Sequence, residues 1–182
     1  MATAREAQDV RAEPRARVID FGRLMWSEYL GFVGALVLFG SLFLTWWSTS
    51  CSSIQGQAGT PAGCNINSKL HGHPGDFTAF QTYRFLGWLL VAACAAPFIL
   101  GYIIARGHEL TWRPGEVTMI VGMLAAALIL MNGIILGRPG STVDLSFGGG
   151  YWIGLLGALL ILAGGLIRQA QGARARKPPG VV

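Results

Sequence analysis

The residues with the most versatile chemistry stand together in the segment HGHPGD. His71, His73 and Asp76 supply imidazole and carboxylate groups, which bind divalent transition metals, and alternate residues of an extended segment can converge on one ion. Histidines in loops, however, usually face water, and no further strong ligand follows at a fixed spacing. We therefore expect no metal and no cofactor, and we keep these three residues as the candidates if a metal is bound.

Catalytic motifs are missing from the sequence. It contains no Ser-His-Asp arrangement, HExxH motif or Walker pattern, and Gly148–Gly150 lacks the following strand and helix context that phosphate-binding loops require. Paired carboxylates within the apolar segments, which intramembrane hydrolysis and glycosyl transfer would need as acid and base, are also absent. We expect no catalytic residue and predict that the protein is not an enzyme.

The apolar composition determines where the polar residues can lie. Hydrophobic residues make up 52% of the 182 residues. Charged residues make up 13%, about half the share in soluble proteins. No Lys, Arg, Asp or Glu occurs in residues 29–68, 85–105, 117–137 or 145–167. A soluble domain cannot cover four such helices with so few polar side chains, so the sequence predicts an integral membrane protein.

Four segments are long enough to cross a bilayer as helices, which takes about 20 apolar residues for a core of about 30 Å. They are apolar on all sides, which excludes the alternating pattern of a transmembrane β-barrel. The sequence therefore predicts an all-α membrane protein, a four-helix transmembrane bundle. Its tails, spans and loops alternate as 1–28 (tail), 29–47 (first span), 48–84, 85–105 (second span), 106–116, 117–137 (third span), 138–146, 147–167 (fourth span) and 168–182 (basic tail).

The basic residues indicate the orientation. Eleven of the 14 Lys and Arg residues lie in the two tails and the middle loop, and the two other loops hold only Lys69, Arg84 and Arg138. The bias of bases toward the cytoplasm predicts that both termini are cytoplasmic. The same bases meet anionic lipid headgroups, which accounts for the net charge of +5 without nucleic acid. We expect no nucleic-acid binding.

The two outer loops suggest a small extracytoplasmic cap. The first loop holds Cys51 and Cys64, whereas Cys94 lies within the second span. Cysteines in an extracytoplasmic loop form a natural pair, and closing about 14 residues would constrain the unfolded loop by roughly 3 kcal/mol. A metal site with two thiols so spaced matches no closed zinc pattern, so we predict a disulfide. The alternation in residues 143–147 of the second loop predicts a strand that pairs with an extended part of the first loop.

Aromatic residues gather at the predicted ends of the spans. They are Trp26, Tyr29, Trp46, Trp47, Tyr83, Trp88, Trp112, Tyr151 and Trp152. Such rings sit at headgroup depth, so we expect them to anchor the helices rather than stack on a ligand. In the N-terminal tail, Val18, Phe21 and Met25 recur near helical spacing, which suits either a short interfacial helix or a plain lead-in to the first span.

Polar and small residues within the spans are expected to serve helix packing. Asn132 carries an amide with no evident local partner, so we expect a hydrogen bond to another helix, worth about 0.6–2 kcal/mol, with a lipid or partner contact as the alternative. Pro97 removes a backbone donor in mid-span, which predicts a helix kink. Against a background of 26 glycines, the series Gly150, Gly154 and Ala158 is placed in a helix–helix interface.

Three stretches carry a family resemblance: FLTWWS at the end of the first span, DFTAFQTYRFLGWLL entering the second, and GGGYWIGLLGALLILAGG in the fourth. They resemble small four-span membrane proteins of actinobacteria and related high-GC bacteria, over roughly residues 26–168. This implies a bacterial cytoplasmic membrane and no particular activity. The layout is also similar to that of claudin-like four-helix proteins, but 48–50 is Ser-Thr-Ser where those have Gly-Leu-Trp, so junction-type assembly is not implied.

Three functional hypotheses follow from the lack of buried charge, the small-residue faces and the long outer loop. We expect a non-enzymatic accessory or assembly subunit of a bacterial membrane complex, in contact with the lipid bilayer and with a protein partner or a second copy. The alternative is a lipid or apolar small-molecule binding or transport protein, with a crevice at Pro97 lined by Cys94, Asn132 and aromatic residues. The third is a membrane enzyme with a metal site in the outer loop.

Overall fold

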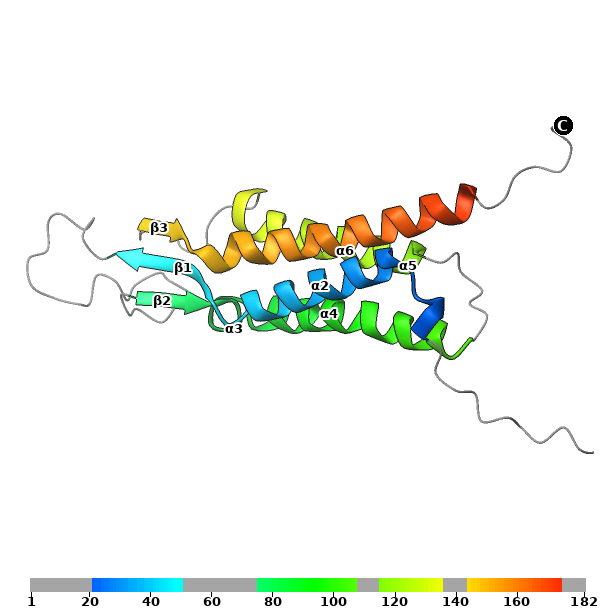
Figure 1. Ribbon diagram of the computed structural model, residues 1–182. Coiled ribbons are helices and arrows are strands. Elements are labelled where there is room, and N and C mark those ends of the chain that lie inside the picture. The colour runs from blue at the N-terminus through cyan, green and yellow to red at the C-terminus, as the bar shows by residue number, and fades with distance from the viewer. Residues whose placement is uncertain (1–20, 51–74, 108–114, 136–143, 175–182) are drawn as a thin grey trace, which may run out of the picture.

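The computed structural model describes residues 21–50, 75–107, 115–135 and 144–174. In these residues four long helices lie side by side, and three strands extend from one end of the bundle (Figure 1). We call this the sheet end, and the opposite end, where α2 begins, the ion-pair end. The elements are η1 (Phe21–Arg23), α2 (Trp26–Ser41), β1 (Thr45–Ser50), β2 (Gly75–Thr78), α3 (Ala79–Thr82), α4 (Arg84–Ala105), α5 (Glu116–Leu130), the π-helix η4 (Met131–Ile135), β3 (Asp144–Phe147) and α6 (Gly149–Arg174).

Three described helices are long and apolar enough to cross a membrane, in agreement with the second, third and fourth predicted spans. They are Phe85–Ala105, Glu116–Ile135 and Gly149–Gly172. The first helix differs from its prediction, because α2 has 16 residues and ends at Ser41 rather than Trp47. The chain makes a turn there, in which the amide of Leu44 donates to the carbonyl of Ser41, and then enters β1. The arrangement is that of a membrane protein with three such helices, and the fourth crossing stays a prediction.

The strands form an antiparallel sheet in the order β2–β1–β3. In its register Trp47 of β1 lies opposite Phe77 of β2 on one side and Phe147 of β3 on the other. The strand predicted in the second outer loop is therefore confirmed as β3, and its partner β1 begins within the last residues of the predicted first span. Cys51 and Cys64 lie outside the described residues, so their disulfide stays a prediction.

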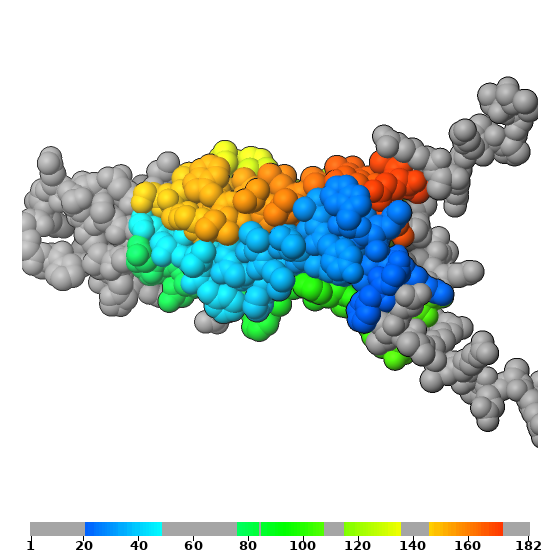
Figure 2. Space-filling model, viewed as in Figure 1, coloured from blue at the N-terminus to red at the C-terminus, as the bar shows by residue number. Residues whose placement is uncertain are grey.

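Helix α6 packs on both α2 and α5 through glycines. A Cβ atom built at Gly157 would lie 2.5 Å from the backbone nitrogen of Leu38, and one at Gly34 would lie 2.8 Å from the carbonyl oxygen of Gly157. Toward α5, a Cβ at Gly122 would lie 2.3 Å from the backbone nitrogen of Leu162. These neighbours are backbone atoms, so only glycine allows the helices to come so close. Figure 2 shows α2 and α6 in contact along the visible face.

Helix α4 meets α2 through an aromatic side chain instead. The ring of Phe32 lies over Gly101, where an added Cβ would be 2.4 Å from the ring. Phe32 also stacks on Phe98, with ring centroids 5.1 Å apart and planes 8° apart. Helix α4 continues through Pro97, which packs against Gly31 at 3.8 Å from a Cβ built there. The predicted kink at Pro97 stays a prediction.

The prediction that Trp46, Trp47 and Tyr151 anchor the protein at the membrane surface is wrong. All three are at most 1% exposed, and the Tyr151 ring contacts both tryptophan rings. The Nε1–H of Trp46 donates to the carbonyl of Ser41 at 2.7 Å. Only three residues separate α2 from β1, and Trp46 and Trp47 of β1 therefore turn inward, between the sheet and α6. Four other predicted anchors are exposed, namely Trp26, Tyr29, Trp88 and Trp152.

Candidate functional site

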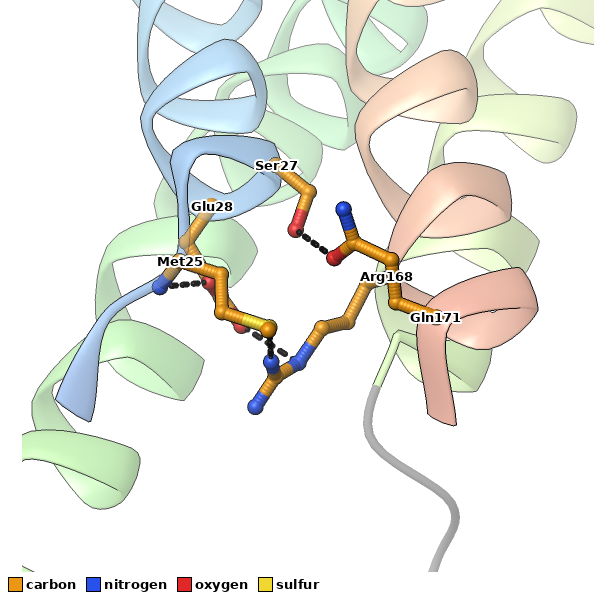
Figure 3. A network of polar contacts seen from close by, with 5 residues as sticks. All are labelled: Met25, Ser27, Glu28, Arg168 and Gln171. Carbon is orange, nitrogen blue, oxygen red and sulfur yellow. Dashed lines mark hydrogen bonds and ion pairs between the residues drawn. The ribbon is translucent and has the colours of Figure 1, made fainter. Parts of the chain in front are cut away.

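A network of polar side chains joins α2 and α6 at the ion-pair end (Figure 3). The Nε of Arg168 lies 2.8 Å from Oε1 of Glu28, and the two side chains are only 18% and 10% exposed. The other carboxylate oxygen of Glu28 accepts the backbone N–H of Met25 at 2.6 Å. A guanidinium nitrogen of Arg168 contacts the sulfur of Met25. Beside them, the hydroxyl of Ser27 donates to Oε1 of Gln171 at 3.4 Å.

The position of Glu28 in its helix explains its double role. Glu28 is the third residue of α2, from which a carboxylate reaches back to the unpaired amide at the helix start, here that of Met25. A negative charge there also complements the helix dipole. The remaining carboxylate oxygen is thereby aimed at Arg168 on α6. The network fixes the first turn of α2 against α6.

A cavity of about 50 Å³ lies beside this network, between α2, α4, α5 and α6. Its lining includes the Glu28–Arg168 pair, Ser27 and Thr118 on the polar side and Phe32 among the apolar residues. A partly polar cavity of this size can hold a few water molecules. The arrangement can therefore hydrate a nearly buried ion pair. Among the described residues, no three His, Cys, Asp or Glu side chains come together.

Two tyrosine hydroxyls hold the other end of α5, where the chain forms the π-helix η4. Tyr83 donates to the carbonyl of Asn132 at 2.6 Å, and Tyr151 donates to the carbonyl of Ile129 at 3.1 Å. A π-turn disturbs the regular backbone ladder, and these carbonyls gain tyrosine donors. Gly133 leaves room for the ring, since a Cβ there would lie 2.4 Å from the Tyr151 oxygen. Burial, and in second place the nearby Tyr151, raise the pKa of Tyr83, so its hydroxyl stays a donor.

The hydrogen bond expected from the Asn132 side chain to another helix is absent from the described residues. Its Nδ2 donates at 2.9 Å to the carbonyl of Leu128, one turn back in the same helix. The backbone carbonyl of Asn132, rather than the amide, contacts a separate segment through Tyr83. Sequence reasoning overlooked that a polar side chain in a helix can reach a carbonyl of the preceding turn, as Ser41 also does toward Leu38.

An apolar groove opens between α2 and α4 in the middle of the bundle. Its volume is about 230 Å³, and its lining residues are Ala35, Leu36, Phe39, Val91, Cys94, Ala95 and Phe98. Cys94 is a free, buried thiol. The sequence predicted a crevice with Cys94 and aromatic residues, and the groove joins these. Asn132 is not among its lining residues, because it lies in η4 rather than on α2 or α4.

The small-residue series of α6 faces α2 and the start of β1. A Cβ at Gly150 would lie 2.7 Å from the Trp46 ring, and one at Gly154 would lie 2.8 Å from the Ser41 hydroxyl oxygen. Ala158 is fully buried. The glycines of α6 that meet helix backbone most closely were missed by sequence reasoning, and they are Gly157, Gly164 and Gly165.

The metal candidates of the HGHPGD segment are tested only at Asp76. His71 and His73 lie outside the described residues. Asp76 belongs to β2, and its carboxylate accepts a hydrogen bond from the Ser48 hydroxyl of β1. This bond gives Asp76 a role in joining the two strands.

No family model, curated protein or solved structure matches the chain.

Proposed function

We propose that the chain is a non-enzymatic, multi-pass protein of a bacterial cytoplasmic membrane, an accessory or assembly subunit that holds its small sheet toward a partner protein or a second copy. In this proposal all four long helices cross the bilayer, the sheet lies outside, and both termini are cytoplasmic. The 16 residues of α2 rise about 24 Å, and the apolar turn that follows adds length toward a hydrocarbon core of about 30 Å.

The observation that carries the proposal is the tight junction between sheet and bundle. Three residues separate α2 from β1, and only Gly148 separates β3 from α6. The amide of Gly148 donates to the carbonyl of Trp46 at 2.8 Å, which continues the strand pairing up to the helix. The side chains of Trp47 and Tyr151 fill the space between the sheet and α6. The sheet is thereby held to two helices at once, which supports a role in presenting a fixed surface.

The distribution of charge supports the orientation. Helix α2 begins and α6 ends at the ion-pair end, so both tails leave the bundle there. These tails and the middle loop carry eleven of the 14 basic residues. Such an excess of Lys and Arg residues favours the cytoplasmic side of the membrane for both tails and the middle loop.

Photo-cross-linking in native membranes tests the assembly role. A photoreactive residue replaces Ser146, which is exposed on β3, and a control replaces Leu156, which is 54% exposed on α6. We expect a discrete protein adduct, to a partner or a second copy, from position 146 and a much weaker one from position 156. Trp46→Ala, which empties the junction, should lower the adduct yield while the protein stays in the membrane. A monomer without an adduct at position 146 would contradict the proposal.

A further inference from the structure

The groove between α2 and α4 has a deep floor and a bulky rim. Cys94 lies at the centre of the 22-residue helix α4, so the groove is at mid-depth of a membrane-length helix. Its floor is formed by Ala35 and Cys94, which are 0% and 4% exposed. Its rim is formed by Leu36, Phe39 and Phe98, which are 41–61% exposed. No charged side chain lines it. Such a groove at this depth suits hydrocarbon.

The rim disfavours a second protein helix as the occupant. Membrane helices associate closely where small residues let the backbones approach. Of the glycines of α2, Gly31 and Gly34 already face α4, α5 and α6 within the chain, and Gly40 lies in the last turn of the helix, outside the groove lining. The exposed leucine and phenylalanine side chains of the rim would hold an incoming helix backbone away. A flexible acyl chain can conform to them and fill the floor.

Arg106, the residue that follows α4, lies on the same side of this helix as Phe98 and at headgroup depth. Phe98, Tyr102 and Arg106 follow one another at intervals of four, which places them along one side of the helix. The exposed guanidinium of Arg106 lies 4.9 Å from the Tyr102 ring centroid, which holds it on that side. Arg106 lies eight positions after Phe98, which corresponds to a rise of about 12 Å, within the roughly 15 Å of one leaflet. A lipid with its chain in the groove would bring its phosphate to Arg106.

We propose that this groove binds one acyl chain of an anionic phospholipid from the leaflet at the ion-pair end, with the lipid phosphate beside Arg106. The groove lies in the middle of the bundle and Arg106 at the end opposite the sheet, so the site includes no residue of the sheet. Lipid binding in the groove is therefore independent of partner binding by the sheet.

Lipid retention by the full chain tests the site. The protein is reconstituted in vesicles with equal phosphatidylglycerol and phosphatidylcholine, extracted in mild detergent, and weighed with its bound lipid by native mass spectrometry. Ala95→Phe fills the groove, and Ala92→Phe, at an exposed position of α4 outside the groove, is the matched control. Wild type and the control should retain one phospholipid, mainly phosphatidylglycerol. Ala95→Phe should retain about tenfold less, the effect of about 1.4 kcal/mol of lost binding energy.

Two further measurements keep the test decisive. Arg106→Gln should abolish the preference for phosphatidylglycerol. A photoreactive residue at position 36 of the detergent-extracted protein should yield a lipid adduct, whereas one at Leu124, 54% exposed on α5, should not. The Leu36 probe sits on the rim and alters no buried residue, so it applies even if Ala95→Phe does not fold. Equal lipid retention by both alanine variants, a wild type without bound lipid, or a protein adduct from position 36 would each overturn the proposal.

Discussion

Replacement of Gly157 by alanine should drive α2 and α6 apart. The new Cβ would lie 2.5 Å from the nitrogen and 2.8 Å from the Cα of Leu38, and 2.9 Å from the carbonyl oxygen of Gly34. Favourable carbon contacts lie at about 3.5–4.0 Å, so the helices must separate by roughly 1 Å, which forfeits up to half of the dispersion energy at the contact. Overpacking of this kind costs about 1–3 kcal/mol. The better helix propensity of alanine offsets up to about 1 kcal/mol. At full offset, we expect a net loss of up to about 2 kcal/mol in the free energy of unfolding.

The matched control for this change is Gly40→Ala on α2. A Cβ at Gly40 meets no atom within 4 Å, so the control should be neutral or slightly stabilised. Unfolding is followed by titration with SDS in mild detergent micelles. The loss of helical structure, followed by far-ultraviolet circular dichroism, reports unfolding and applies equally to variants that lack Trp46 or Trp47. If Gly157→Ala unfolds at the same SDS concentration as Gly40→Ala, the argument from backbone contact is refuted.

Three further changes test other contacts by the same titration. Glu28→Gln should cost about 1–3 kcal/mol because it leaves Arg168 nearly buried without its counter-charge, and adding Arg168→Met should restore part of the loss; no recovery would contradict this. Burial raises the pKa of Tyr83 above its ordinary value of about 10, so its contribution to stability is complete below that pH and is lost as the pH rises further. Unfolding free energy should fall less between pH 9 and pH 11 in Tyr83→Phe than in wild type, and an unchanged slope would count against the contact. Trp46→Phe should destabilise by about 1 kcal/mol more than Trp47→Phe, since Trp46 donates a 2.7 Å hydrogen bond and the Nε1 of Trp47 has no hydrogen-bond partner in the described part of the chain; equal losses would contradict the assignment.

The positions of three of the long helices could be predicted from the sequence because a helix needs about 20 apolar residues to cross a bilayer. The uncharged run 85–105 coincides with a helix of membrane length, Phe85–Ala105. The same reasoning failed at the first helix, where the run continues past Ser41. The apolar run continues through Trp46 and Trp47 because these side chains fill the junction with the sheet. Composition alone does not distinguish an apolar side chain in lipid from one in a protein core.

The contact between α2 and α6 is visible in the sequence as a glycine spacing of seven, which the small-residue pattern at intervals of four does not reveal. Gly150, Gly157 and Gly164 are spaced by seven residues along α6, and each meets α2 or the chain that continues it into β1. A repeat of seven is the pattern of helices that remain side by side over several turns. In the structure these three glycines form the face of α6 toward α2, with Gly154 between them.

The ion pair was also missed, although its position is visible in the sequence. Glu28 directly precedes the first uncharged run, and Arg168 directly follows the last. By themselves, charges at the ends of the spans indicate only the topology. Once the first and fourth helices are neighbours that run in opposite directions, these two residues must lie at the same end of the bundle. The cavity beside them depends on packing that the sequence does not reveal.

Cysteine accessibility in intact cells tests the four-span arrangement most directly. In a chain with Cys51→Ser and Cys64→Ser, single cysteines replace Ser146 on the sheet, Phe21 before α2 and Gly172 near the end of α6. The account predicts that a membrane-impermeant maleimide labels position 146 in cells whose inner membrane is intact, and labels positions 21 and 172 only after that membrane is permeabilised. Labelling of position 21 together with position 146, or of all three positions from one side, would contradict it.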